Sequence, residues 1–478
     1  MKYLLPFFLF VCCMKLEGNA QKIAIEPYLF INKQKDTIQA ELGKFIVPEN
    51  RNNPNGKQLA LSFVRFKSTN PTPAAPIVYL AGGPGGSGIN TARGDRFSLF
   101  MRLREVADVI AFDQRGTGMS NELPSCPYEF IMEQERAIKK AEYLDSTLQH
   151  IEKCLNFWKA EGHDLKAYNT TESAFDINDL RKALGVKKIS LWGISYGSHL
   201  GFEYIRNFAP SVERIVLASL EGPDETLKSP AATDNFLKEI CKRAADNYGS
   251  RRKYPDLERT IKSVHERLQK EPVVYTYRDL RTGKDERVGI SNFELQFAIA
   301  GFFIKDPQNS RNLPRVYTEM NEGNFSRVAP MIALLKRYLS QEIRPMSFAM
   351  DMNSGISAKR KARIAKEMEK ATLGSTVNFL YYEWMDALDF GQLPDEFRTL
   401  PENKVNVLLL SGSLDGRTYL ESAKQIAKSF KKGKHIIIDN AGHNLYMTDP
   451  LISDLVVNFF KGKRLSITGI KLRPTKFK

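Results

Sequence analysis

Short apolar runs separated by segments of helical periodicity occupy the first half of the chain. Residues 44–47 and 59–66 are hydrophobic segments on either side of a turn-rich stretch, and they predict two strands. Residues 77–81 and 106–112 are mostly apolar, which is typical of strands buried on both faces of a parallel sheet. The alternation of such runs with helical segments predicts an α/β domain.

The next predicted strand runs directly into a helix. Residues 188–194 form an apolar run that continues as Gly-Ile-Ser-Tyr-Gly at 193–197, and a helix-like segment follows to about residue 208. Residues 170–184 begin with capping residues and are followed by glycine, which predicts a helix before this strand. A sixth strand is predicted at residues 214–218.

The alternation stops at about residue 222 and resumes with strands at residues 405–410 and 435–439. The pattern in between is helical, with one short hairpin near residues 281–284. We therefore expect a mostly parallel sheet flanked by helices, with a large, mainly helical cap inserted after the sixth strand. The expected boundaries are residues 21–221 for the first part of the core, with a helical insertion at about 121–168, residues 222–400 for the cap, and residues 401–478 for the second part of the core with its basic tail.

Composition and charge narrow the range of partners. With 42% hydrophobic and 26% charged residues among 478, the chain has an ordinary globular composition. Its formal net charge is +15, but the excess lies in scattered pairs and in the C-terminal tail, and no nucleic-acid recognition motif accompanies it. We expect a solvated tail and no nucleic-acid partner. No metal-ligand spacing is present, and neither a metal nor a cofactor is expected.

The N-terminus has the pattern of a targeting segment. A basic start at Lys2 precedes a short apolar stretch, and small residues lead up to position 20. This predicts a signal peptide over residues 1–20 and a periplasmic or extracellular mature protein. A lipid anchor on Cys12 or Cys13 is an alternative, which the neighbouring residues disfavour. No later run is long and apolar enough for a transmembrane helix, so no integral membrane segment is expected.

Three cysteines follow the predicted signal peptide. Cys126 and Cys154 are expected to form a disulfide in an oxidising compartment, and chain entropy predicts a stabilisation of about 3–4 kcal/mol for it. Cys241 has apolar neighbours at helical spacing and is expected to be a buried free thiol.

A glycine-rich loop at residues 82–88 allows two interpretations. Its glycines fit G-x-G-x-x-G, and Asp113 ends the next strand, as the acid of a dinucleotide site would. Pro84, however, removes a backbone donor that a pyrophosphate needs, and two strands precede the loop. The favoured interpretation is one half of an oxyanion hole, in which the backbone N–H of Gly83 binds a carbonyl oxygen.

Ser195 is the candidate nucleophile because it occupies the centre of G-x-S-x-G at a strand-to-helix junction. A serine hydroxyl needs a base, and among six histidines His443 lies in a loop directly after the last strand of the predicted sheet. Asp415 follows the preceding strand and is the candidate acid, with Glu221 and Asp224 as alternatives. The order Ser, Asp, His along the chain predicts a hydrolase triad.

The predicted triad defines a reaction. His443 would accept the proton of Ser195 as its Oγ attacks a carbonyl carbon, and Asp415 would hold the imidazole in the required tautomer. The backbone N–H groups of Tyr196 and Gly83 would bind the oxyanion, each contributing about 2.7–4 kcal/mol. Water would then release the acyl group from the serine.

Three motifs together resemble the proline iminopeptidase and tripeptidyl aminopeptidase family of α/β-hydrolases, namely residues 82–88, 113–120 and 193–198. The cysteine pair before the elbow and the large cap look closest to the secreted tripeptidyl aminopeptidase branch. The resemblance implies an α/β-hydrolase fold and a serine exopeptidase that removes a single residue or a tripeptide from peptides with a free N-terminus. The sequence departs from the family at Ala81, where histidine is frequent, and at Gly416-Arg417, where a proline-containing turn is usual, which bears on substrate details.

An aminopeptidase of this kind needs an anion for the ammonium group of its substrate. Glu383, set among aromatic residues of the predicted cap, is the first candidate and Glu221 the second, although a helix-surface carboxylate would explain Glu383 equally well. Because a triad does not distinguish esters from amides, a carboxylesterase for small esters is the alternative function. A binding protein on a hydrolase scaffold is a further alternative, but it would not need to keep all three triad residues.

Overall fold

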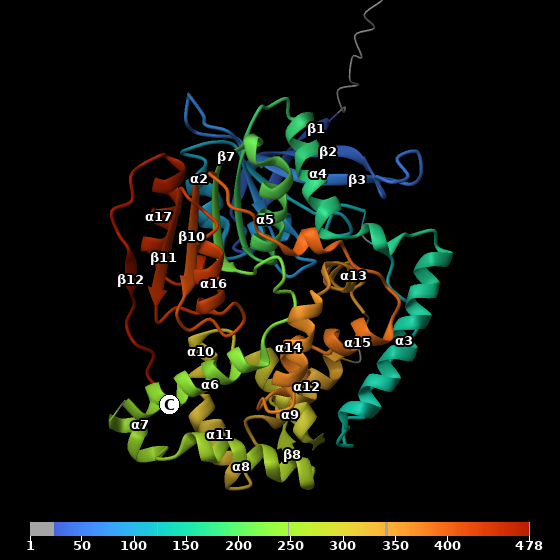
Figure 1. Ribbon diagram of the computed structural model, residues 1–478, viewed down its shortest axis with the longest axis vertical. Coiled ribbons are helices and arrows are strands. Elements are labelled where there is room, and N and C mark those ends of the chain that lie inside the picture. Colours follow the sequence, from blue (N-terminus) through green and yellow to red (C-terminus); the bar gives the residue numbers. More distant parts are fainter. Residues whose placement is uncertain (1–22, 122, 247, 340–342, 478) are drawn as a thin grey trace, which may run out of the picture.

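The computed structural model describes residues 23–121, 123–246, 248–339 and 343–477. A sheet with helices on its faces forms the upper part of the molecule in Figure 1, and a mainly helical cap forms the lower part. The predicted signal peptide, residues 1–20, lies outside the described residues. Within the described ranges, no helix has the length and hydropathy needed to cross a membrane.

The central sheet has the spatial order β1-β2-β3-β5-β4-β6-β7-β10-β11-β12. Strand pairs at the β1 edge, up to β3 with β5, are antiparallel, and all the others are parallel. This confirms the predicted mostly parallel sheet. The strands are β1 (Ala24–Ile31), β2 (Thr37–Pro48), β3 (Gln58–Phe66), β4 (Ile77–Leu80), β5 (Val109–Phe112), β6 (Ile189–Ser195), β7 (Val212–Leu220), β10 (Val407–Gly412), β11 (Gly433–Asp439) and β12 (Gly469–Lys471).

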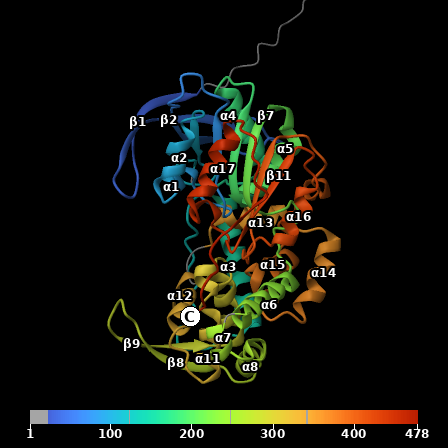
Figure 2. The ribbon, with the colours of Figure 1, turned by 90° about the vertical axis from the view of Figure 1, so that its left-hand side faces the viewer.

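Helices cover both faces of this sheet, as Figure 2 shows from the side. α4, α5 and α16 pack into the hydrophobic core on one face, and α1, α2 and α17 into the core on the other. The inner strands β4, β5 and β10 are therefore buried along their whole length, which explains their continuous apolar sequences. The helices are α1 (Gly88–Arg93), α2 (Phe97–Leu103), α4 (Thr170–Ala183), α5 (Tyr196–Phe208), α16 (Leu420–Ala427) and α17 (Pro450–Phe460), with short turns η1 (Leu165–Ala167), η2 (Ala209–Ser211) and η6 (Leu445–Met447).

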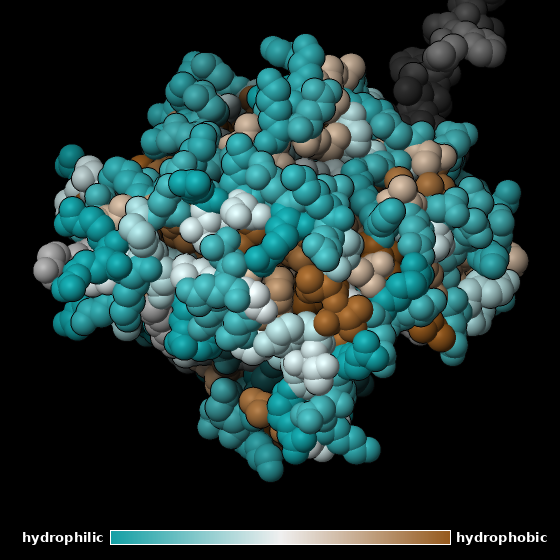
Figure 3. Space-filling view, turned by 90° about the horizontal axis from the view of Figure 1, so that it is seen from below, coloured by the Kyte–Doolittle hydropathy of each residue, from teal (hydrophilic) through white to brown (hydrophobic). Residues whose placement is uncertain are grey.

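The cap lies between β7 and β10 in sequence and has a hydrophobic core of its own. Its hairpin, β8 (Val273–Arg278) with β9 (Asp285–Ile290), forms a separate two-stranded sheet at the predicted place. Seen from below, this end of the molecule is mostly hydrophilic and exposes a smaller apolar area (Figure 3). The other elements are α6 (Pro230–Asp246), α7 (Tyr248–Lys253), α8 (Leu257–Lys270), α9 (Asn292–Ala298), η3 (Ile299–Phe303), α10 (Pro307–Ser310), α11 (Leu313–Asn321), α12 (Ala329–Leu339), α13 (Pro345–Ser354), α14 (Ala358–Met368), η4 (Gly374–Asn378), α15 (Tyr381–Ala387) and η5 (Asp395–Arg398).

The helix α3 (Lys140–Ala160) precedes the elbow in sequence but runs alongside the cap (Figure 1). Its Tyr143 packs against Phe293 of α9, with ring centroids 5.4 Å apart. Lys336 of α12 is completely buried and donates hydrogen bonds to three carbonyls of the segment before α3, those of residues 133, 134 and 136. The small insertion expected at about 121–168 therefore packs with the large one.

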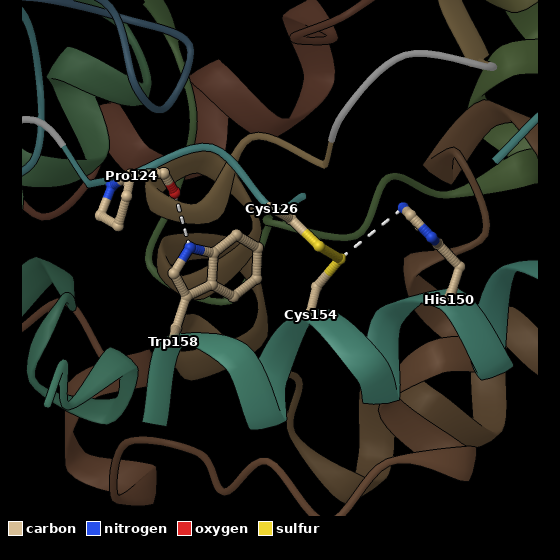
Figure 4. The surroundings of a disulfide bond; sticks show 5 residues. All are labelled: Pro124, Cys126, His150, Cys154 and Trp158. Atoms are coloured by element: carbon tan, nitrogen blue, oxygen red, sulfur yellow. Dashed lines mark hydrogen bonds between the residues drawn. A yellow bond between two sulfur atoms is a disulfide. The ribbon is translucent and has the colours of Figure 1, made fainter. Parts of the chain in front are cut away.

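The disulfide between Cys126 and Cys154 joins the segment before α3 to α3 itself (Figure 4). The two Cα atoms are 5.4 Å apart, and the predicted pairing is confirmed. One turn earlier on α3, Nε2 of His150 lies 3.7 Å from Sγ of Cys154. These three residues are close enough to hold a metal ion, but the two sulfurs are bonded to each other, so the imidazole is the single donor that remains among them. Cys241 is a buried free thiol, as predicted, and burial raises its pKa to about 12.

Both edges of the sheet differ from the prediction. β1 was not predicted, because as an outer strand it leaves alternate residues such as Leu29 and Ile31 exposed and buries Phe30 instead. The cap consequently follows the seventh strand, not the sixth. The basic tail is not simply solvated: β12 pairs with β11, and the tail then reaches the cap, where Phe477 packs against the hydrophobic core.

Candidate active site

Ser195 occupies the turn between β6 and α5 with a left-handed backbone, φ 58° and ψ −128°. A non-glycine residue rarely adopts such values, and the surrounding close packing holds it there. A Cβ atom on Gly197 would lie 2.2 Å from the carbonyl oxygen of Leu80 on the neighbouring strand β4, so only glycine fits that position. The structure therefore has the strained strand-to-helix turn that the G-x-S-x-G pattern indicates.

His443 and Asp415 meet at the same edge of the sheet, in the loops after β11 and β10. His443 Nδ1 lies 2.9 Å from Oδ2 of Asp415 and 3.1 Å from its Oδ1, so the ring N–H donates to the carboxylate. The backbone N–H groups of Arg417 and Thr418 also donate to Asp415, as does the Thr418 hydroxyl. Burial alone would raise the pKa of Asp415, but His443 and these donors outweigh it and lower the pKa below its ordinary value.

The backbone of His443 is fixed from two sides. Its carbonyl accepts a hydrogen bond of 2.6 Å from the hydroxyl of Ser219, at the end of β7. Its N–H donates to the carbonyl of Lys305, 3.1 Å away, in the cap segment that follows η3. The candidate base is thus held by both the core and the cap.

Ser195 and His443 line one cavity of about 440 Å³ together with Gly82 and Gly83. A Cβ atom on Gly82 would come within 3.3 Å of the Cβ of Ser195, so the glycine-rich loop passes directly beside the candidate nucleophile. Tyr196, the other predicted oxyanion residue, is the first residue of α5 and its side chain is buried. The cavity is therefore a place where a carbonyl carbon could be attacked and its oxygen bound by backbone N–H groups.

Asp113 stabilises the glycine-rich loop. Its Oδ1 accepts hydrogen bonds from the Ser87 hydroxyl at 2.6 Å and from the backbone N–H of Ile89 at 3.0 Å, and its Oδ2 accepts one from the N–H of Met119. Burial raises the pKa of this carboxyl group, although the hydrogen bonds oppose the shift. Asp113 is fully occupied by the protein, which argues against the ribose-binding role of the dinucleotide interpretation.

The structure separates the two candidates for the substrate ammonium group. Glu383 is not on the wall of the 440 Å³ cavity; α15 directs it toward α3, where Lys140 Nζ lies 2.5 Å from its Oε1. Helical periodicity does not reveal which neighbouring helix a side chain faces, so the sequence alone could not place Glu383 beside α3. Glu221 does line the cavity, and it forms a 2.7 Å ion pair with Lys228. Asp224, an alternative acid of the triad, instead accepts hydrogen bonds from Ser357.

The other histidines have partners elsewhere. His199 is buried between the carbonyl of Gly222 and the hydroxyl of Ser354, and His265 bonds Asn292 and Tyr317 inside the cap. His150, His163 and His435 do not line the cavity of Ser195 either.

Sequence reasoning missed several charged residues of this site. Arg96, Lys228, Lys305 and Arg417 all line the cavity. Asp351 of α13 is close enough to Glu221 for the two carboxylates to repel, and burial, followed by this repulsion, raises its pKa well above the ordinary value. Gly416-Arg417 was noted only as a departure from the turn that is usual in the family; Arg96, Lys228, Lys305 and Asp351 carry no local signal of a site.

Comparison with known proteins places the fold and this arrangement in a class. Residues 75–270 match the family described as alpha/beta hydrolase fold. Together with the mostly parallel sheet and its flanking helices, this match identifies an α/β-hydrolase fold.

The second part of the core and the sequence relatives show a narrower similarity. Residues 386–469 match the family described as TAP-like protein. Similar proteins are the serine protease Hip1 of Mycobacterium tuberculosis, 30% identical over 190 residues, and the tripeptidyl aminopeptidase of Streptomyces lividans, 31% identical over 195 residues. Each match covers 38% of this chain and 36% of the relative, so the matched stretch spans about a third of the length of these proteins.

A solved structure, the proline iminopeptidase-related protein from Thermus thermophilus, is similar over 88% of this chain and 98% of that one. The identity is 17% and the TM-score 0.39, too low to support any argument about the site.

Proposed function

We propose that this chain is a secreted serine aminopeptidase that removes a short N-terminal piece, a single residue or a tripeptide, from peptides. The observation that carries the proposal is the hydrogen-bonded pair of His443 and Asp415 at the cavity that Ser195 lines. The relatives named serine protease and tripeptidyl aminopeptidase support a peptidase. The Cys126–Cys154 disulfide supports an oxidising compartment, the periplasm or the cell exterior.

The proposed reaction uses the pairing of His443 with Asp415. Because Asp415 accepts the N–H at Nδ1, the Nε2 of His443 is free to take the proton of Ser195 as Oγ attacks the peptide carbonyl. The N–H groups of Tyr196 and Gly83 bind the oxyanion. His443 then gives the proton to the leaving amine, and a water activated by the same imidazole hydrolyses the acyl-enzyme.

Glu221 is the proposed anchor for the substrate's ammonium group. Glu221 lies on the cavity wall and forms an ion pair with the ammonium group of Lys228. The ammonium group of a substrate would bind the same carboxylate. Asp351 nearby adds a second carboxylate whose charge a bound cation would stabilise.

Purified mature protein incubated with a peptide mixture, with products identified by mass spectrometry, tests the activity. Shortened peptides lacking a residue or a tripeptide at the N-terminus are expected from the wild type and not from Ser195→Ala. Cleavage of simple esters alone would favour the carboxylesterase alternative. Equal product formation by Ser195→Ala would contradict the proposal altogether.

Two matched variants test the ammonium anchor. Glu221→Gln is expected to lower kcat/KM on peptides with a free N-terminus about 10- to 100-fold relative to N-acetylated peptides or esters, because a charge-assisted hydrogen bond is lost. Glu383→Gln, which alters a carboxylate outside the cavity, is the control and should leave this ratio unchanged. Equal losses on both substrate types in Glu221→Gln would remove Glu221 from the role.

A further inference from the structure

The cavity of Ser195 carries an excess of positive charge. Its wall holds four cationic side chains and a single carboxylate, that of Glu221. Lys228 is neutralised by Glu221, which leaves three cations that form no ion pair within 4.0 Å among the described residues: Arg96, Lys305 and Arg417. A cavity that only had to bind an ammonium group would not be built in this way.

Two of these cations flank the candidate base. Nη2 of Arg96 donates a hydrogen bond of 2.8 Å to the side chain of Asn444, the residue after His443. Lys305 accepts the N–H of His443 through its own carbonyl, and its side chain lines the cavity and is otherwise exposed. Arg417 lies on another part of the wall, where it stacks on Phe379 with its guanidinium 4.8 Å from the ring centroid.

Arg96 is held firmly, but by neutral groups. Besides Asn444, it donates to the hydroxyl of Tyr79, and its guanidinium lies 5.9 and 5.8 Å from the rings of Tyr79 and Tyr446. A guanidinium has five N–H groups, so donors remain available after these two hydrogen bonds. An oriented guanidinium with free donors and no paired carboxylate is suited to bind a carboxylate in a bidentate manner.

A second cavity, of about 760 Å³, continues from this point. Thr91, Arg96 and Asn444 line both cavities. The second one adds Lys33 and Arg93 as cations and two carboxylates, Asp95 and the fully hydrogen-bonded Asp113. Arg96 therefore stands at the passage between the site of bond cleavage and a larger polar space.

The position of His443 indicates which part of the substrate lies near Arg96. The imidazole gives its proton to the leaving nitrogen, so the leaving part of the substrate must pass beside the ring. We propose that Arg96, assisted by Lys305, binds a carboxylate carried by the leaving part, close to the bond that is cleaved. This inference rests on the proposed serine hydrolase function and specifies its substrate class: substrates whose leaving part is anionic.

Two sources could supply such a carboxylate, and two pairs of peptides distinguish them. In the first pair the leaving part is one residue, with a free α-carboxylate or a C-terminal amide. In the second pair longer amidated peptides have Asp or Asn as the first leaving residue. The third pair, 4-acetoxybenzoate and 4-acetoxybenzamide, consists of esters whose leaving parts are anionic and neutral. This pair therefore tests the preference even if the protein does not cleave peptides.

The wild type is expected to show about tenfold higher kcat/KM on the anionic member of at least one pair, and the preference should fall as sodium chloride is raised because the site is partly open to solvent. Arg96→Gln should reduce the ratio to about one, and Arg96→Lys should restore part of it. Arg93→Gln removes a neighbouring arginine that lines only the second cavity, and it should keep the wild-type ratio. Thermal unfolding of each variant checks that it is folded.

The outcomes separate this inference from the proposed function. Peptide cleavage with a ratio near one in all three pairs, or a ratio that Arg96→Gln leaves at the wild-type value, overturns the inference while the peptidase proposal stands. Turnover of the ester pair alone, with a preference that depends on Arg96, supports the inference and contradicts the peptidase. Absence of turnover in every pair overturns both.

Discussion

The core and the cap build their parts of the site by different means. In the core, Ser195, Asp415 and His443 lie at the carboxyl ends of parallel strands. Their positions are fixed mostly through the main chain: a strained turn at Ser195, backbone donors to Asp415, and the backbone carbonyl of His443, which accepts from the Ser219 hydroxyl. The cap and the segments at its border contribute side chains with charge, such as Lys228 and Lys305. The comparison teaches that the proposed triad depends here on the sheet, whereas the charged side chains around it come from both the core, as with Arg96, and the insertion, as with Lys305.

The largest effect is expected from a change in the core. Asp415→Asn should lower kcat by about 10⁴-fold, because the amide cannot hold His443 in the tautomer that leaves Nε2 unprotonated. Steady-state kinetics on any cleaved substrate, ester or peptide, measures it, and all should fall together. If kcat fell for only one substrate class, Asp415 would contribute to substrate selection, and the difference between the roles of core and cap would not hold.

For the cap, the largest expected effect is on the stability of the protein. Lys336 and Glu294 form a completely buried 2.7 Å ion pair, and Lys336 also holds the segment before α3. Lys336→Met should lower the free energy of unfolding by about 3–5 kcal/mol, because it leaves a buried carboxylate unpaired. Urea denaturation measures this.

Arg337→Met is the matched control for Lys336→Met. Arg337 is the next residue on the same helix, and its partly exposed side chain makes a 3.7 Å contact with Glu286 of β9 and contacts Tyr277, so the variant should cost less than about 1 kcal/mol. Adding Glu294→Gln to Lys336→Met should recover part of the loss. Similar losses of unfolding free energy in Lys336→Met and Arg337→Met would show that the buried ion pair contributes no more to stability than the partly exposed contact.

The smallest effect concerns Asp351, at the border of the two regions. The pKa of Asp351 in the folded protein lies above its unfolded value of about 3.8, so folding favours the protonated acid. The stability that the protonated acid contributes is fully present below pH 3.8, and it is lost as the pH rises through the raised pKa. Asp351→Asn lacks this loss and should unfold at a higher midpoint than the wild type at pH 7–8.

Thermal unfolding at several pH values tests this. The difference between Asp351→Asn and the wild type should shrink toward pH 4. A variant less stable than the wild type at pH 8 would show that the charge of Asp351 is compensated by partners that outweigh its burial.

The same division explains what the sequence could predict. Apolar runs and a glycine pattern indicate buried strands and an elbow, because a parallel sheet imposes them on residues close together in sequence, and the predicted disulfide pairs residues only 28 positions apart. The contact of Arg96 with Asn444 joins residues 348 positions apart. The surroundings of Glu383 could not be predicted for the same reason: its helix was predictable, but not its contact with Lys140 of a preceding insertion.

The hydrogen bond from the His443 main chain to Lys305 has a mechanical consequence. Any movement that lifts the cap from the sheet would withdraw the acceptor of the N–H group on the residue proposed to pass protons. Turnover then becomes sensitive to how well the two halves of the molecule are seated on each other, without any contact between the cap and Ser195 being required.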